Sequence, residues 1–244
     1  MARGRLDLLL VQRGLCGTRA QAQARIMAGE VLVGDRPVTK AGTLVAEDAE
    51  LRLRGEAPRF VSRGGLKLDH ALTAFGLDPG GWVCFDAGAS TGGFTDCLLQ
   101  RGAARVYAVD VGTNQLHWKL RTDPRVVSME QVNLRNWDPA RIPERCRLLV
   151  ADVSFISLRL VVPPLLPSLL PGADAVLLVK PQFEAGRDEV GAGGIVRDPA
   201  THRRVQEELW SFFQDTPLRP RGWCDSPILG GEGNREFLLH LQLN

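Results

Sequence analysis

The chain has 244 residues, 44% of them apolar and 24% charged, which suits one α/β domain plus a small second domain and excludes an unfolded chain. No apolar segment is suited to cross a bilayer and no signal peptide is visible, so we expect a cytoplasmic protein without a membrane partner. The five cysteines show no disulfide spacing and the four histidines show no zinc spacing, so we expect reduced thiols and no metal. The formal net charge of +2 is unevenly distributed. Residues 1–60 have ten Lys or Arg and seven Asp or Glu, hence +3, and the remaining residues have 20 Lys or Arg and 21 Asp or Glu, hence −1. The N-terminal end is therefore the one expected to bind an acidic partner.

Residues 1–57 are predicted to form a small separate module. Its second helix is expected to be capped by Thr18 and to stop at Ala28-Gly29. The predicted elements are two helices, ending near Gly14 and at Met27, and strands at 31–33, 37–38 and 50–54 with a turn at Gly34-Asp35. Glu56-Ala57-Pro58 indicates a linker, which we place at 58–63, before a larger domain at 64–244. Taken by itself, the module could instead be a cap that only packs on the main domain.

This first module resembles the S4 RNA-binding domain over nearly its whole length. The matching residues, at the family's spacing, are Arg5-Leu6-Asp7, Gly14, Thr18-Arg19, Ala22, Ile26, Gly29-Glu30-Val31, Val33-Gly34, Val38 and Lys40. The resemblance implies that a basic face of the second helix contacts folded RNA, mainly through phosphates. The RNA-binding residues expected on this basis are Arg5, Arg19, Arg25 and Lys40, together with Arg63 after the linker.

The stretch 83–96 carries the pattern of a nucleoside cofactor site. An apolar run ends in Asp86, a loop of small residues follows, and a second apolar run ends in Asp110, which is placed to bind a ribose diol. Ser90 breaks the G-x-G-x-x-G pattern, and the acid at the loop mouth favours a cationic ligand such as S-adenosylmethionine. The alternative is an ordinary βα turn with two strand-end acids. The candidate cofactor residues are Asp86, Gly88, Ser90, Gly92, Gly93, Phe94, Asp110 and, less directly, Asn133.

Beyond the linker, strands and helices alternate, which predicts a Rossmann-like doubly wound sheet. Strands are expected at 82–86, 105–110, 125–129, 147–152, 174–180, 218–224 and 236–242, and helices at 66–76, 93–101, 113–121, 157–170 and 200–213. The last two strands have no helix between them, so we expect an antiparallel hairpin. The segment 186–194 has four glycines in nine residues and is a candidate mobile loop.

Reactive residues of such a fold are expected at the carboxyl ends of the strands. Those ends carry Asp86, Asp110, Asp152 and Lys180. The motif for amino-group methylation, Asn or Asp before Pro-Pro and an aromatic residue, is absent after Asp152, and no cysteine follows a proline as carbon-5 pyrimidine methylation would require. The remaining lysine and carboxylate groups suit a hydroxyl acceptor.

The chain as a whole resembles the TlyA family of ribosomal RNA 2′-O-methyltransferases, once called haemolysins. The matching stretches are 62–68 (SRGGLKL), 86–95 (DAGASTGGFT), 151–158 (ADVSFISL), 179–184 (VKPQFE) and 233–237 (GNREF). The resemblance implies an FtsJ-like methyltransferase domain behind the S4 domain, with S-adenosylmethionine as cofactor and ribosomal RNA or a ribosomal subunit as partner. It places the catalytic Lys-Asp-Lys-Glu tetrad on Lys67, Asp152, Lys180 and Glu236, and it implies a cytidine of the large-subunit RNA as target.

In this interpretation Lys180 removes the proton of the ribose hydroxyl or stabilises the alkoxide, while Asp152 and Glu236 hold the two lysines. The sequence does not decide which lysine is the base, and it leaves the oligomeric state open. Three other functions remain as alternatives: a membrane-active haemolysin-like protein, a pseudouridine synthase whose catalytic Arg-Leu-Asp would correspond to Arg5-Leu6-Asp7, and an S4-containing RNA-binding protein without methyltransferase activity.

Overall fold

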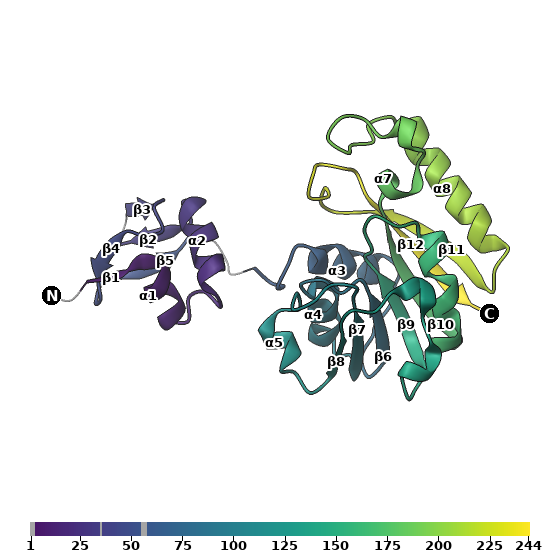
Figure 1. Cartoon of the computed structure of the whole chain (residues 1–244), viewed down its shortest axis with the longest axis horizontal. Helices are drawn as coiled ribbons and strands as arrows, with labels where there is room; N and C mark the ends of the chain where they lie inside the picture. Colours follow the sequence, from purple (N-terminus) through teal and green to yellow (C-terminus); the bar gives the residue numbers. More distant parts are fainter. Residues whose placement is uncertain (1–2, 35, 55–57) are drawn as a thin grey trace. The chain divides into compact units, whose positions relative to one another are not determined.

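The computed structural model describes residues 3–34, 36–54 and 58–244, and it divides into two compact units, Met1–Arg59 and Phe60–Asn244 (Figure 1). Asp35 of the predicted turn and Glu56 and Ala57 of the predicted linker lie outside the described residues. Within the described ranges, no helix combines the length and the apolar character that crossing a membrane requires.

The first unit packs two helices on short strands. The helices are α1 (Leu6–Gln12) and α2 (Arg19–Met27), and the strands are β1 (Arg3–Arg5), β2 (Val31–Val33), β3 (Arg36–Val38), β4 (Leu44–Ala46) and β5 (Leu51–Leu53). The strands pair antiparallel in the orders β3-β2-β5 and β1-β4. Thr18 caps α2 as predicted, because its hydroxyl oxygen accepts a hydrogen bond from the backbone N–H of Gln21 at 3.2 Å. The β1–β4 pair was not predicted, since strands of three residues show too little alternation.

The second unit is built on a seven-stranded sheet in the order β11-β12-β10-β9-β6-β7-β8. Its strands are β6 (Val83–Ala87), β7 (Arg105–Val109), β8 (Val126–Met129), β9 (Cys146–Ala151), β10 (Leu169–Val179), β11 (Leu218–Asp225) and β12 (Phe237–Leu243). Neighbours from β10 to β8 are parallel, whereas β12 is antiparallel to both β10 and β11. The predicted doubly wound sheet and the terminal hairpin are both confirmed.

Three helices of this unit lie close to their predicted positions, and two other predicted helices are wrong. The helices found are α3 (Gly64–Ala74), α4 (Gly93–Gln100), α5 (Trp118–Arg121), α6 (Leu158–Val161), α7 (Pro181–Glu184) and α8 (Pro199–Gln214), with 3-10 turns η1 (Leu134–Asn136), η2 (Pro139–Arg141), η3 (Pro163–Ser168) and η4 (Arg187–Glu189). The predicted helix 157–170 breaks into α6 and η3 because prolines 163, 164 and 167 remove backbone donors. The predicted helix 113–121 shortens to α5.

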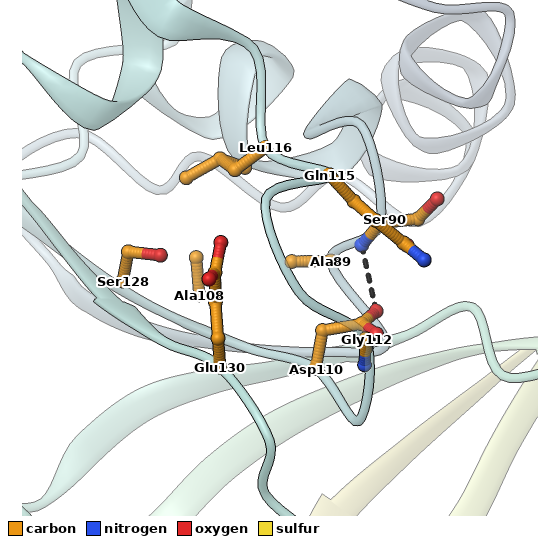
Figure 2. A pocket seen from close by; sticks show the side chains of 9 residues that line it. All are labelled: Ala89, Ser90, Ala108, Asp110, Gly112, Gln115, Leu116, Ser128 and Glu130. Atoms are coloured by element: carbon orange, nitrogen blue, oxygen red, sulfur yellow. Dashed lines mark hydrogen bonds between the residues drawn. The ribbon is translucent and has the colours of Figure 1, made fainter.

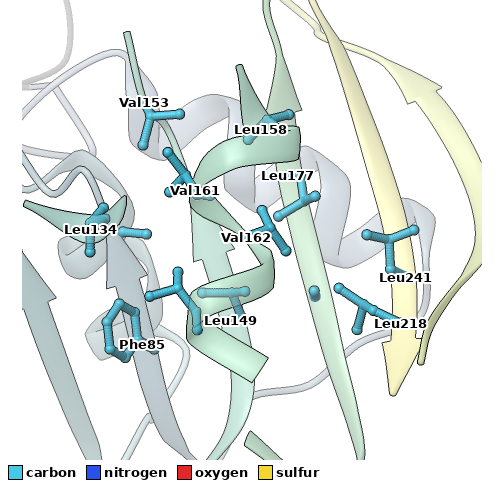
Figure 3. Packing of buried hydrophobic residues seen from close by; sticks show 14 of the residues in the cluster. Phe85, Leu134, Leu149, Val153, Leu158, Val161, Val162, Leu177, Leu218 and Leu241 are labelled. Atoms are coloured by element: carbon cyan, nitrogen blue, oxygen red, sulfur yellow. The ribbon is translucent and has the colours of Figure 1, made fainter. Parts of the chain in front are cut away.

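Apolar side chains cover both faces of this sheet, which fixes where a site can form. One core cluster joins the sheet to α6, η3 and α8, and Figure 3 shows Phe85, Leu149 and Leu177 of neighbouring strands within it. The other joins the sheet to α3, α4 and α5. Because both faces are filled, ligands must bind at an edge, and the strand order reverses between β6 and β9. In open sheets of this kind the crevice lies outside the carboxyl ends of the strands at that reversal.

Candidate functional site

The loop between β6 and α4 brings bare backbone to the carboxyl edge of the sheet. Gly88, Ser90 and Gly92 have φ values of +82°, +47° and +97°, in the left-handed region that favours glycine. A Cβ atom at Gly88 would lie 2.7 Å from the backbone oxygen of Asp152, and one at Gly92 would collide with the side chain of Leu120. A side chain is therefore excluded at Gly88 and at Gly92, and the backbone of the loop is bare at these two positions.

Asp110 at the end of β7 organises the outer side of that loop. Its two carboxylate oxygens accept hydrogen bonds from the backbone N–H groups of Ser90 at 2.8 Å and of Gly112 at 2.7 Å. These residues line a small cavity together with Ala89, Ala108, Gln115, Leu116, Ser128 and Glu130 (Figure 2). The side chain predicted to bind a ribose thus also shapes the loop around it.

Glu130, which sequence reasoning missed, enters the same cavity. Its Oε1 atom is buried and has no hydrogen-bond partner among the described residues. Figure 2 shows its carboxylate beside Ala108 and Ser128. An unpaired buried acceptor is costly, so it needs a donor such as a nucleoside hydroxyl or amino group. The signal was present in the sequence, because Glu130 directly follows the third predicted strand.

A larger cavity of about 240 Å³ opens on the other side of the loop. Lys67 and Asp152, two members of the predicted tetrad, both line it. The other lining residues are Ser62, Arg63, Gly64, Gly88, Ala89, Ser90, Thr91, Gly93 and Phe94. Cofactor-loop residues and tetrad residues therefore share one cavity.

The predicted tetrad forms two ion pairs at this cavity. Lys67 Nζ lies 2.5 Å from Glu236 Oε2, and their side chains are only 9% and 3% exposed. Lys180 Nζ lies 2.6 Å from Asp152 Oδ1 and donates a hydrogen bond to Ser154 Oγ at 2.8 Å. Through Lys67 and Asp152, the structure brings both pairs to the same space although the residues come from four separate segments.

Asp86 does not lie at the mouth of the loop, contrary to the prediction. The residue is completely buried beneath the loop and lines neither cavity. Its Oδ2 atom accepts a hydrogen bond from Thr95 Oγ1 at 2.6 Å, while Oδ1 has no partner among the described residues. Burial raises the pKa of this carboxyl from 3.8 to about 7. Asp86 therefore anchors the start of α4 under the loop.

Asn133 is also not brought to either cavity. Its side-chain oxygen accepts a hydrogen bond from the backbone N–H of Arg135 at 3.0 Å, so it caps the turn η1. By contrast, two other candidate cofactor residues, Phe94 and Gly93, line the larger cavity, and Ser90 lines both cavities.

An exposed aromatic side chain stands next to the Lys180–Asp152 pair. Phe155 is 91% exposed and has a φ of +63°, which is strained for a residue of this size. Its ring centroid lies 5.0 Å from that of Phe183, and Lys180 Nζ lies 5.9 Å from the Phe183 ring. Such a ring can stack on a nucleic-acid base. This exposure was not predicted, because an aromatic residue in an apolar segment is more often buried.

The predicted RNA-binding residues divide into exposed and covered ones. Arg5 and Arg19 have side chains 43% and 53% exposed, and Lys40 is exposed as well. Arg63 is exposed and lines the larger cavity of the second unit. Arg25 is only 13% exposed and lies 3.8 Å from Glu30, so it is not on an open basic face as predicted.

Comparison with known proteins agrees with this geometry. Residues 60–243 match the FtsJ-like methyltransferase family, and residues 4–51 match the S4 domain. The chain is 51% identical to YqxC of Bacillus subtilis, a candidate rRNA methyltransferase, over 97% of this chain and 85% of that protein. It is 46% identical to the 16S/23S rRNA (cytidine-2′-O)-methyltransferase TlyA of Mycobacterium tuberculosis, over 98% and 90% of the two chains. A solved structure of a candidate hemolysin from Streptococcus thermophilus has a TM-score of 0.78 and 48% identity, covering all of this chain and 90% of that one.

Proposed function

Because the chain belongs to the TlyA family, in which an S4 domain precedes an FtsJ-like methyltransferase domain, we propose that it methylates a ribose 2′-hydroxyl in ribosomal RNA. The observation that carries the proposal is the meeting of two lysine–carboxylate pairs, Lys67–Glu236 and Lys180–Asp152, at the cavity lined by the glycine loop. Base methylation would call for different groups, and the residues around this cavity suit a hydroxyl acceptor.

The residues around the glycine loop fit S-adenosylmethionine as the methyl donor. The bare turn at Gly88 and Gly92 leaves room for the methionine part, and the unpaired oxygen of Glu130 offers an acceptor to the nucleoside part beside Asp110. When bound, this cofactor supplies a methyl group made electrophilic by its attachment to a sulfonium. Asp110 and Glu130 orient the nucleoside, and the negative charge of Asp152 faces the cavity where the sulfonium is expected.

The residues of the chain then prepare the acceptor. A ribose hydroxyl is a weak nucleophile near neutral pH, so a neighbouring group must take its proton or stabilise the negative charge that develops. Lys180 is the candidate for this task because its Nζ atom is held by Ser154 and by Asp152, which lines the cavity. Lys67, held by Glu236, lines the same cavity and supplies a second fixed positive group there. Holding donor and acceptor in line contributes much of the rate.

Two features support RNA as the molecule that carries the hydroxyl. Phe155 offers an open ring for a base next to Lys180, and Arg63 places a positive charge at the edge of the same cavity. The S4 unit adds the exposed Arg5 and Arg19 for phosphates. We infer a cytidine of the large-subunit RNA as the target, since the name of the Mycobacterium tuberculosis relative specifies cytidine and includes the 23S RNA beside the 16S RNA.

The proposal is tested by incubating the purified protein with isotope-labelled S-adenosylmethionine and a large-subunit ribosomal RNA transcript or ribosomal subunits. The RNA is digested to nucleosides and analysed by mass spectrometry. We expect the label on the ribose of cytidine, as 2′-O-methylcytidine. Label on a base, or the absence of label from every RNA substrate together with leakage of liposomes caused by the protein, would refute the proposal in favour of another function.

A further inference from the structure

The first unit contains a completely buried carboxylate beneath two exposed arginines. Asp7, the second residue of α1, is 0% exposed. Its Oδ1 atom accepts a hydrogen bond from Arg5 Nε at 3.0 Å. Its Oδ2 atom accepts three, from Arg5 Nη2 at 3.0 Å, Arg19 Nε at 2.9 Å and Gln23 Nε2 at 2.9 Å. One acid therefore joins the β1 strand, the start of α1 and one side of α2.

These bonds leave the outer ends of both guanidinium groups available. Arg5 uses Nε and Nη2 and Arg19 uses Nε, whereas Nη1 of Arg5 and both terminal nitrogens of Arg19 bond no other residue in the described part of the chain. The two side chains remain about half exposed. Their remaining donors thus face solvent from fixed positions.

The Asp7 carboxylate offsets the repulsion between the Arg5 and Arg19 guanidinium groups. Two guanidinium groups side by side repel each other and would spread apart without a shared counter-charge. Asp7 supplies that charge from below, and the Arg5 hydrogen bond in particular holds the pKa of its carboxyl well below the usual range. The acid therefore stays ionised. Planar guanidinium donors fixed in this way match the oxygens of a phosphate.

We propose that Asp7 is a positioning residue that makes Arg5 and Arg19 a preformed clamp for one phosphate group of the RNA backbone. The inference rests on the proposed function, since it assumes that the S4 unit binds RNA. It also gives Arg5-Leu6-Asp7 a role other than that of a pseudouridine synthase triplet, because a carboxylate that is buried and accepts four hydrogen bonds cannot act on a base.

The proposal predicts an effect opposite in sign to simple electrostatics. Asp7→Asn removes a negative charge from the RNA-binding unit, which by charge alone should strengthen binding to a polyanion. If Asp7 positions the arginines, binding should instead weaken by about tenfold, the loss expected for one charge-assisted contact. The matched control is Asp48→Asn, which removes one charge from an exposed acid in the same unit.

The measurement is the affinity of the full-length variants for a large-subunit ribosomal RNA transcript at several salt concentrations. We expect Asp48→Asn to bind as well as the wild type or better, and Asp7→Asn to bind more weakly. If Asp7→Asn binds at least as tightly as Asp48→Asn, the proposal is wrong.

A second variant keeps the test decisive if Asp7→Asn does not fold. Arg19→Lys keeps the charge on an exposed side chain but loses the planar group that reaches both Asp7 and a phosphate. Weaker binding with an unchanged salt dependence supports the clamp, whereas wild-type affinity contradicts it. Wild-type protein that binds no ribosomal RNA would refute the proposed function itself. Wild-type binding with normal binding by both variants would refute only the role of Asp7.

Discussion

The two site lysines are each held by a carboxylate from a distant part of the chain. Glu236 reaches Lys67 across 169 positions of sequence, and Asp152 reaches Lys180 from the neighbouring strand. Removing one partner of a buried pair leaves an uncompensated charge, so the acids cannot be deleted without disturbing the lysines. The lysines are therefore the better probes of catalysis.

Replacing Lys180 by alanine should lower single-turnover methyl transfer by at least about a hundredfold, the lower end of a general-base contribution. Binding of S-adenosylmethionine, measured by calorimetry, should remain, because Lys180 lines neither cavity next to the glycine loop. Lys119→Ala is the control, since this lysine is 60% exposed. Normal turnover by Lys180→Ala would remove this lysine from the mechanism.

The buried Asp86 predicts a pH dependence of stability. Its pKa of about 7 in the folded protein lies above the ordinary 3.8, so between these values the folded protein holds a proton that the unfolded chain has lost. Its contribution therefore favours folding at acid pH and is lost as the pH rises through 7. From pH 5 to pH 8, the wild type should therefore lose on the order of a few kcal/mol of unfolding free energy relative to the Asp86→Asn variant. Denaturant titrations at several pH values measure this, and a difference independent of pH would contradict it.

At the scale of elements, the segment that follows β9 and the segment that follows β10 contact each other beside the site. After β9 come Asp152 and Phe155, and after β10 come Lys180 and Phe183, with contacts between both sets. Glu184 of α7 connects the same two segments further along the chain. It accepts hydrogen bonds from Ser157 Oγ at 2.7 Å and from the backbone N–H of Leu158 at 2.8 Å.

Replacing Glu184 by glutamine should remove one of these two acceptors and loosen both segments. We expect the rate of methyl transfer to fall by about tenfold, because a small displacement of the reacting groups from their aligned positions lowers the rate strongly. The affinity for S-adenosylmethionine should change little, since the glycine loop is untouched. Glu207→Gln on the exposed face of α8 is the control. Equal losses of rate, cofactor affinity and thermal stability would indicate a purely structural residue.

The sequence predicted those elements whose signals are local. The cap at Thr18 follows from one residue, and the alternation of strands and helices led to the doubly wound sheet. The broken helix after Ser157 shows the limit, because its apolar residues fit a helix until the prolines remove the backbone donors. By contrast, packing between distant segments buries Asp86 and leaves one oxygen of Glu130 without a hydrogen-bond partner among the described residues. No local sequence pattern encodes such packing.

At the scale of the whole molecule, the arginines proposed to bind RNA phosphates, Arg5 and Arg19, lie in the first unit, whereas both cavities lie in the second. Each unit has its own core, formed in the first by residues such as Leu10, Ile26 and Val31 and in the second by the two faces of the sheet. Domains with their own cores fold independently as a rule. The cofactor cavity is lined entirely by residues of the second unit.

Deleting residues 1–57 should therefore leave the affinity for S-adenosylmethionine nearly unchanged while productive binding of ribosomal RNA is lost. Calorimetry with the cofactor and methyl transfer to ribosomal RNA measure the two properties in the same preparation. A truncated protein that methylates RNA as fast as the full chain would make the first unit a structural cap.

Ribose methylation of ribosomal RNA can be tested in cells by mapping 2′-O-methyl groups on the ribosomal RNA of strains with and without this gene. We predict that at least one cytidine 2′-O-methyl group disappears on deletion. It should return with the wild-type gene and not with the Lys180→Ala gene. Identical maps from the two strains, or the loss of a base methyl group instead, would contradict the account.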